Sequence, residues 1–417
     1  MRLLSLTQQQ LNTMLGAATA GDVNTYVLPV VVTAMARLEH QRLRRVLELL
    51  AFRHPSLCLR IRSSGGAFYQ YIADDRWLDG EGIQTVDAPA ISDQAVQEIF
   101  RKLVGTIDVE NGPLWNVALL RTPDEDHLVF AFHHFAADML SLPILMRDAA
   151  LLYEHGDDAA PASDSYLDYV RSIPVHLSAS DLSGDATWWV DRPWDAVTRT
   201  KEVRPDLLGT HGLQEQIHWE TLPWRPVDLR DTERDLVYAL ALGISKIAGT
   251  KVVRLDIGRH GRAVRGTQPS HRRAVGWLAQ AVPHFFRVSD GFSPEECARQ
   301  LDETSAREAY WEEAQQFMCG AGRTTTGYVP FAHAVVNVQG LTFRAGQRSG
   351  VLRLSRYQPA VSFPAHRAAH VPVRLTVHAD QDALHLRWRV LPVFRSPETS
   401  TGIAQFVTNA LRGSERR

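Results

Sequence analysis

Three side chains suited to proton transfer lie close together in the sequence: His133, His134 and Asp138. Imidazole has an unperturbed pKa near 6.5, so a histidine can take up and release a proton at neutral pH. A histidine beside a strand is usually only a hydrogen-bonded polar residue, whereas an adjacent pair followed by an aspartate in one loop favours a reactive site. The pattern therefore predicts general acid–base chemistry at this point of the chain.

The elements on either side of these residues would hold them at a strand end. Residues 128–132 are short, continuous and apolar, which predicts a buried strand. Apolar residues then recur with helical spacing from Leu142 to Tyr153, and Gly156 predicts the end of that helix. Neighbouring side chains of a strand point to opposite faces, so we expect one histidine to be functional and the other structural.

Other stretches alternate between helix and strand in both halves of the chain. The apolar spacing predicts helices over residues 38–52, 236–248 and 294–313. Strands are predicted over residues 252–257, 333–338, 351–354, 373–377 and 383–390. Residues 157–226 lack a long periodic stretch, and we place the junction between two lobes there. The fold class is therefore α/β (α+β) with two lobes.

Composition excludes several classes of protein. The 417 residues carry a formal net charge of −2, which disfavours a nucleic-acid binder, and 45% are hydrophobic, as in packed globular domains. No apolar run approaches the roughly 20 residues that cross a bilayer, and the N-terminus does not resemble a signal peptide, so we expect a cytoplasmic protein. The three cysteines, Cys58, Cys297 and Cys319, are best explained as free thiols.

Several motifs occur together in a fixed order. "HHFAAD" at residues 133–138 is similar to HHxxxDG, and "LSLTQ" at 4–8, "RHPSL" at 53–57 and "IDVENGPL" at 107–114 precede it. "GR" at 261–262 and "AVGW" at 274–277 follow it. With these motifs the chain resembles the condensation domains of nonribosomal peptide synthetases and their acyltransferase relatives, which share the chloramphenicol acetyltransferase-like fold.

The resemblance implies an architecture and a reaction. It implies two acetyltransferase-like lobes, which we divide at residues 1–175 and 176–417, arranged as a V with the active site in the tunnel between them. We expect a free-standing condensation enzyme that transfers a thioester-bound acyl or aminoacyl group to an amine or hydroxyl acceptor, in secondary-metabolite (nonribosomal peptide or polyketide) biosynthesis. The substrates would arrive on phosphopantetheine arms of acyl or peptidyl carrier proteins acting in trans. No metal or redox cofactor is expected, and neither nucleic acid nor membrane is an expected partner.

The resemblance also implies residue roles. His134 would act as the general base or as a hydrogen-bonding stabiliser, His133 would pack or hydrogen-bond, and Asp138 would hold the loop through an ion pair. We assign Met139, Ser141, Gly276 and Trp277 to the substrate-binding surface.

The chain departs from the family pattern at three positions. Met139 replaces a glycine beside the catalytic loop, Cys58 replaces an arginine, and Gln280 replaces an asparagine. Arg60, Arg259 or Arg262 could supply the charge that Cys58 removes. Residues 259–273 are locally basic and could contact an acidic carrier protein or a pantetheine phosphate, although a solvated loop explains most of them equally well.

Two other functions remain open. The first is a polyketide-associated acyltransferase that forms esters, and the second is a non-catalytic condensation-like module that recruits another enzyme to a carrier protein. Epimerization is disfavoured, because Gly258 and Ala263 occupy the positions of the glutamates in the epimerization motif.

Overall fold

The structure is a computed structural model of the whole chain. It describes residues 3–17, 20–74, 83–173, 182–197, 216–223, 229–262, 271–320, 332–339, 348–360, 371–379, 383–392 and 397–414. No helix within these ranges combines the length and the apolar character that crossing a membrane requires.

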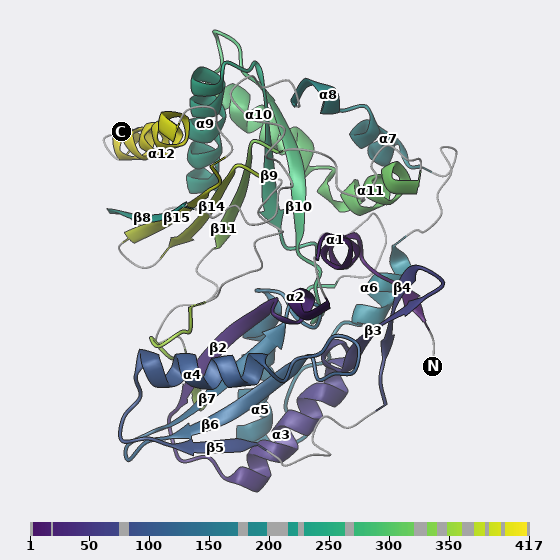
Figure 1. Cartoon of the computed structure of the whole chain (residues 1–417), viewed down its shortest axis with the longest axis vertical. Helices are drawn as coiled ribbons and strands as arrows, with labels where there is room; N and C mark the ends of the chain where they lie inside the picture. Colours follow the sequence, from purple (N-terminus) through teal and green to yellow (C-terminus); the bar gives the residue numbers. More distant parts are fainter. Residues whose placement is uncertain are drawn as a thin grey trace. The chain divides into compact units, whose positions relative to one another are not determined.

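The chain divides into two compact units (Figure 1). Unit 1 comprises Met1–Pro174 together with Gly266–Ala279 and Thr342–Pro364, and unit 2 comprises Val175–Arg265, Gln280–Leu341 and Ala365–Arg417. The division expected at residues 175 and 176 assigned all of the second half to one lobe. Here two segments of that half pack with unit 1 instead, because each of them hydrogen-bonds to its elements.

Unit 1 is built on a six-stranded sheet in the order β12-β13-β2-β7-β6-β5. All its neighbouring strands are antiparallel except β5 and β6. Its strands are β2 (Val27–Ala34), β5 (Gln84–Asp87), β6 (Trp115–Arg121), β7 (Asp126–His133), β12 (Arg348–Ser349) and β13 (Leu352–Leu354). A smaller sheet, β1-β4-β3, comprises β1 (Leu4–Ser5), β3 (Leu59–Ser64) and β4 (Ala67–Ile72).

Helices cover both faces of the larger sheet, so β7 is buried along its entire length. On one face α3 (His40–Arg53) and α5 (Ser141–His155) pack over Leu28, Val30 and Phe130. On the other face α4 (Asp93–Val104) packs over Val31 and Val129. The remaining helices of unit 1 are α1 (Gln8–Gly16), α2 (Ala20–Asn24) and α6 (Tyr166–Ser172). Burial on both faces explains why residues 128–132 of β7 are continuously apolar rather than alternating.

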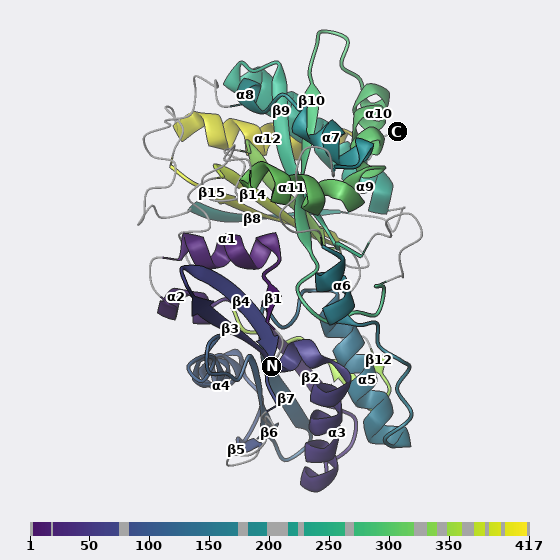
Figure 2. The ribbon, with the colours of Figure 1, turned by 90° about the vertical axis from the view of Figure 1, so that its right-hand side faces the viewer.

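Unit 2 is built on a second six-stranded sheet, in the order β10-β9-β11-β14-β15-β8 (Figure 1), and Figure 2 shows the same unit turned by 90°. Its strands are β8 (Gln216–Pro223), β9 (Val252–Arg259), β10 (Gln280–Arg287), β11 (Ala334–Gln339), β14 (Val373–Ala379) and β15 (Ala383–Val390). Packed against them are α9 (Leu229–Ala248), α10 (Pro294–Ser305) and α12 (Pro397–Ser414). A separate cluster of aromatic residues joins α7 (Gly184–Val190), α8 (Trp194–Val197) and α11 (Trp311–Gly320).

The predicted fold class is confirmed, since both units combine a mixed sheet with packed helices. The predicted elements also correspond to observed ones, with one correction. The single helix expected over residues 294–313 is two helices, α10 and α11, separated by a 3₁₀ turn at Glu308–Tyr310. Cys58 and Cys297 are free thiols, as expected, and burial raises the pKa of Cys297 to about 12. The side chain of Cys319 lies outside the described residues.

Candidate active site

The two histidines lie at the carboxyl end of β7, where the strand gives way to a turn. His133 is fully buried, and its Nε2 lies 2.8 Å from the carbonyl oxygen of Val23. Its Nδ1 accepts a hydrogen bond of 3.1 Å from the amide of Phe135. An imidazole that donates at Nε2 and accepts at Nδ1 is the neutral tautomer with both nitrogens in use. The contacts of His133 therefore support the predicted structural role.

His134 lies between two aromatic rings. The ring of Tyr26 stacks on the imidazole with centroids 4.7 Å apart and planes inclined by 7°. The indole of Trp277 approaches it to 4.3 Å at 41°. The backbone amide of His134 donates to the carbonyl of Tyr26, and the residue keeps 9% of its surface exposed. The two aromatic faces thus hold the ring in one orientation.

Asp138 anchors the loop that follows. One of its oxygens accepts from the amide and the hydroxyl of Ser141, at 2.9 and 2.8 Å. The other oxygen accepts from the amides of Leu278 and Ala279, at 3.1 and 3.0 Å. A carboxylate that is fully buried and accepts several charge-assisted hydrogen bonds holds its surroundings firmly. The loop-holding function expected of Asp138 therefore has a described basis in these amides, and its ion pair stays a prediction.

Ser141 begins α5, and the structure places it in the interior. Besides contacting Asp138, its hydroxyl lies 3.0 Å from the carbonyl of Gly276 and accepts a hydrogen bond of 3.1 Å from the amide of the same residue. Ser141 and Gly276 thus join the loop to the segment 271–279. This finding favours a structural role for both residues over the substrate contact that we assigned to them.

Gly276 is required sterically. A Cβ at this position would lie 2.2 Å from the ring of Tyr166. The Tyr166 hydroxyl in turn accepts a hydrogen bond from Gln10 and donates one to Gln70, both buried. The segment therefore passes against a tyrosine that is itself fixed by two glutamines, one of them in the first helix.

Met139 lies in the turn before α5 and is 37% exposed. Its long side chain therefore does not belong to the core, which is compatible with its assignment to the substrate-binding surface.

Two of the arginines considered as replacements at the Cys58 position bind elsewhere. Arg60 donates to the carbonyl groups of Asn111 and Leu59, whereas Arg259 pairs with Glu233 and Glu308.

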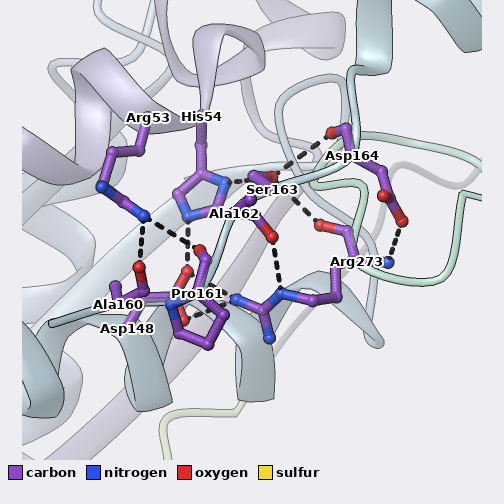
Figure 3. Close-up of polar contacts among 9 residues, drawn as sticks. All are labelled: Arg53, His54, Asp148, Ala160, Pro161, Ala162, Ser163, Asp164 and Arg273. Atoms are coloured by element: carbon purple, nitrogen blue, oxygen red, sulfur yellow. Dashed lines mark hydrogen bonds and ion pairs between the residues drawn. The ribbon is translucent and has the colours of Figure 1, made fainter. Parts of the chain in front are cut away.

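A buried ionic cluster near the site was not foreseen from the sequence. Asp148 of α5 is fully buried and contacts His54 and Arg273 (Figure 3). Burial acts to raise the pKa of Asp148, but hydrogen bonds from His54 and Arg273 outweigh it and lower the pKa. The sequence feature that could have indicated the cluster is Asp148 itself, which lies three residues after Leu145 on the apolar stripe of the predicted helix. Tyr26 was also missed, because nothing in its local sequence marks it. No group of three or more metal-binding side chains occurs within the described ranges.

Comparison with known proteins finds relatives that share these features. The family model of the condensation domain matches residues 3–197, which include both histidines and Asp138. This part of the chain is thus similar to a condensation domain. The structure of an epimerization domain, from the third module of tyrocidine synthetase B, superposes with a TM-score of 0.70 at 18% identity, covering 99% of this chain and 96% of the other. A mutant of the starter condensation domain of rhizomide synthetase RzmA, in complex with C8-CoA, superposes with a TM-score of 0.73 at 17% identity, covering 98% and 94%. These likenesses establish the condensation-domain fold, which is the chloramphenicol acetyltransferase-like fold expected from the motifs.

Curated relatives are peptide synthetases. Bacitracin synthase 3 of Bacillus licheniformis is 24% identical over 63% of this chain, and tyrocidine synthase 2 of Brevibacillus parabrevis is 27% identical over 46% of it. The chain spans 4% and 6% of the length of these two relatives. It thus corresponds to a small part of each.

Proposed function

We propose that this chain is a condensation-family acyltransferase that joins a thioester-bound acyl or aminoacyl group to an amine or hydroxyl acceptor. The observation that carries the proposal is the setting of His134. Its imidazole stands at the end of a buried strand, fixed between Tyr26 and Trp277, and the fold is that of condensation domains. A rigid scaffold that fixes one imidazole between aromatic rings at a strand end suits proton transfer to or from a bound substrate.

In the proposed reaction the acceptor nitrogen or oxygen attacks the thioester carbonyl. His134 takes the proton of the acceptor, or stabilises it by a hydrogen bond, while the new C–N or C–O bond forms. The C–S bond then breaks, and the thiol leaves with a proton. Asp138 does not take part as a base, because its described contacts are with the amides and the hydroxyl that hold the loop.

We further propose that the donor arrives on the phosphopantetheine arm of a carrier protein. Support comes from the peptide synthetases among the relatives and from the C8-CoA complex of the RzmA domain, since coenzyme A contains the same pantetheine thiol. Carrier proteins, acyl or peptidyl, are thus the proposed partners, and the assay below identifies the substrates.

The test is intact-mass analysis of candidate loaded carrier proteins, mixed with acceptor and with or without the enzyme. His134→Ala should slow transfer by about 10²- to 10⁴-fold, as is typical when a general acid–base group is lost. His155→Ala, which removes an exposed histidine at the end of α5, is the matched control and should retain wild-type rates. Wild-type turnover by a folded His134→Ala protein would contradict the mechanism.

The same assay separates the alternatives. An ester-forming acyltransferase would act on a free alcohol and would not need a peptidyl carrier. A non-catalytic recruitment module would bind a carrier protein without any change of mass in the wild-type reaction.

A further inference from the structure

The Asp148 cluster consists of Asp148, His54, Ser163 and Arg273, brought together from four parts of unit 1 (Figure 3). Both carboxylate oxygens of Asp148 accept from one guanidinium nitrogen of Arg273, at 2.8 and 2.9 Å. His54 Nε2 lies 3.1 Å from the same carboxylate, and His54 Nδ1 lies 3.1 Å from the hydroxyl of Ser163. None of these residues touches His134 in any described contact.

Arg273 is fixed by its main chain as well as by its side chain. Its amide donates to Asp164 at 2.7 Å, and its carbonyl oxygen accepts from the hydroxyl of Ser163 at 3.1 Å. Its Nε donates to the carbonyl of Ala162 at 3.1 Å. With the ion pair included, every polar part of Arg273 except one guanidinium nitrogen has a described contact. Such a residue fixes the path of the chain that follows it.

The chain that follows Arg273 leads directly to the active site. Three residues on, Gly276 is bound by Ser141, and Trp277 comes next and covers the imidazole of His134. Leu278 and Ala279 then bind Asp138. The segment is therefore held at one end by the Asp148 cluster and at the other by Asp138, and Trp277 lies between the two anchors.

A hydrolytic function of the cluster is the main competing explanation, because Ser163, His54 and Asp148 form a hydrogen-bonded series with the residue types of a catalytic triad. The surroundings disfavour it. The side chain of His54 is fully buried, Asp148 already carries the guanidinium of Arg273, and the Ser163 hydroxyl also contacts the Arg273 carbonyl. These contacts use the hydroxyl to hold the chain.

We propose that Arg273, through its ion pair with Asp148, is a positioning residue for His134. It fixes the start of the segment that places Trp277 against the imidazole. Displacement by about 1 Å of groups around a reacting centre can cost about 100-fold in rate. The effect on rate rests on the proposed function, whereas the effect on the environment of the His134 ring does not.

The experiment is NMR of the full chain with ¹³C-labelled histidine. The rings of Tyr26 and Trp277 stack on His134, so their ring currents should shift the ε1 proton of His134 upfield. That signal is identified among the 17 histidines by its loss in His134→Gln, and Trp277→Leu gives its position without the indole. Arg273→Ala should move the signal at least half of the way to the Trp277→Leu position, and Arg273→Lys should move it less.

The matched control is Arg45→Ala, which removes an exposed arginine that also pairs with an aspartate of unit 1, Asp157, and it should leave the signal in place. If Arg273→Ala does not fold, Asp148→Asn tests the same pair with little change of shape. Where transfer is measurable, Arg273→Ala should lower kcat about 10- to 100-fold with a smaller change in KM, and Arg273→Lys should recover part of the loss.

An unmoved His134 signal in folded Arg273→Ala and Asp148→Asn proteins would overturn the proposal, whatever their stability. Failure of the proposed function would look different. The wild-type protein would then transfer nothing, while the His134 signal would still respond to Arg273→Ala.

Discussion

His133 and His134 carry the same side chain and differ in what surrounds each ring. Both ring nitrogens of His133 contact main-chain groups, the carbonyl of Val23 and the amide of Phe135. His134 is held by the faces of Tyr26 and Trp277 instead. Contacts with the ring faces fix the orientation of an imidazole. The strand alternation that separates the two histidines thus gives their rings different surroundings, in line with the proposed division into one structural and one reactive histidine.

His133→Ala should therefore affect stability more than chemistry. The change leaves the Val23 carbonyl and the Phe135 amide without their described partner in a fully buried place, at a cost of about 1–3 kcal/mol for each group. Urea unfolding should show a lower free energy of unfolding. A thermally normal but inactive His133→Ala protein would mean that the roles of the two histidines are exchanged.

Met139→Gly should alter substrate choice with little effect on stability. The Met139 side chain is 37% exposed, so its loss opens no cavity, and the added backbone freedom costs about 0.5–1 kcal/mol. If the thioether narrows the approach to His134, relative rates across donors and acceptors of different bulk should change. Equal relative rates in wild type and Met139→Gly would show that the side chain has no part in selection.

The loop between β7 and α5 is an element whose shape depends on distant residues. The carboxylate of Asp138 faces its own loop with one oxygen and the segment 271–279 with the other. Local sequence cannot stabilise such a loop by itself. The loop therefore acquires its conformation only when the two parts of unit 1 come together.

Asp138→Ala should lower both stability and activity. The amides of Ser141, Leu278 and Ala279 lose a common acceptor in the interior, again at about 1–3 kcal/mol for each group. Asp168→Ala removes an aspartate that is 63% exposed and should change the free energy of unfolding by less than about 0.5 kcal/mol. A melting temperature of Asp138→Ala equal to that of the parent would show that the carboxylate does not hold the loop.

Sequence patterns predicted the elements better than the contacts between them. The apolar run of β7 and the helical spacing of α5 are local properties, and the adjacent histidines could be placed from them. The return of residues 266–279 to unit 1 joins positions more than 130 residues apart, as in Leu278 with Asp138, and no local period records it. Trp277 could be assigned to the site only through the family resemblance. Tyr26 and Arg273 were not assigned to it, because no local pattern marks them.

The division between α10 and α11 shows a tertiary contact overriding a local pattern. Residues 294–313 have helical spacing, yet Glu308 in the intervening 3₁₀ turn pairs with Arg259 of β9 at 3.0 Å. Trp311, at the start of α11, is buried against Trp189 and Trp194. These contacts redirect the chain, and they could not be read from the spacing of apolar residues.

At the scale of the whole molecule, two buried histidines of unit 2 make stability depend on pH. In unit 2, burial lowers the pKa of both His284 and His333 to about 3. The Nδ1 of His284 lies 2.9 Å from the carbonyl of Val282, while within the described residues its buried Nε2 has no hydrogen-bond partner. A second proton on His284 would therefore place a charge in the core. Both rings are neutral in the folded protein at neutral pH.

Stability should consequently fall as the pH falls from about 6.5 toward 3. In that range the unfolded chain binds a proton at each histidine while the folded chain does not, so each contributes a slope of up to about 1.4 kcal/mol per pH unit. Between pH 6 and 4.5, His284→Leu should show a smaller loss of unfolding free energy than the parent. His155→Ala is the control at an exposed position. An unchanged slope in His284→Leu would contradict the buried neutral imidazole.

The chain passes from one unit to the other more than once, and this affects how such proteins can be recombined. Two parts of unit 1 come from the second half of the chain: β13, which pairs with β2, and the amides that bind Asp138. A chimaera joined between residues 174 and 175 would combine the first half of this chain with the β13 and the Asp138-binding amides of another protein. Exchange of a whole unit therefore needs several crossover points rather than one. Among chimaeras built with a single junction, those that fold should come mainly from pairs of parents in which β13 and the segment that binds Asp138 are already similar.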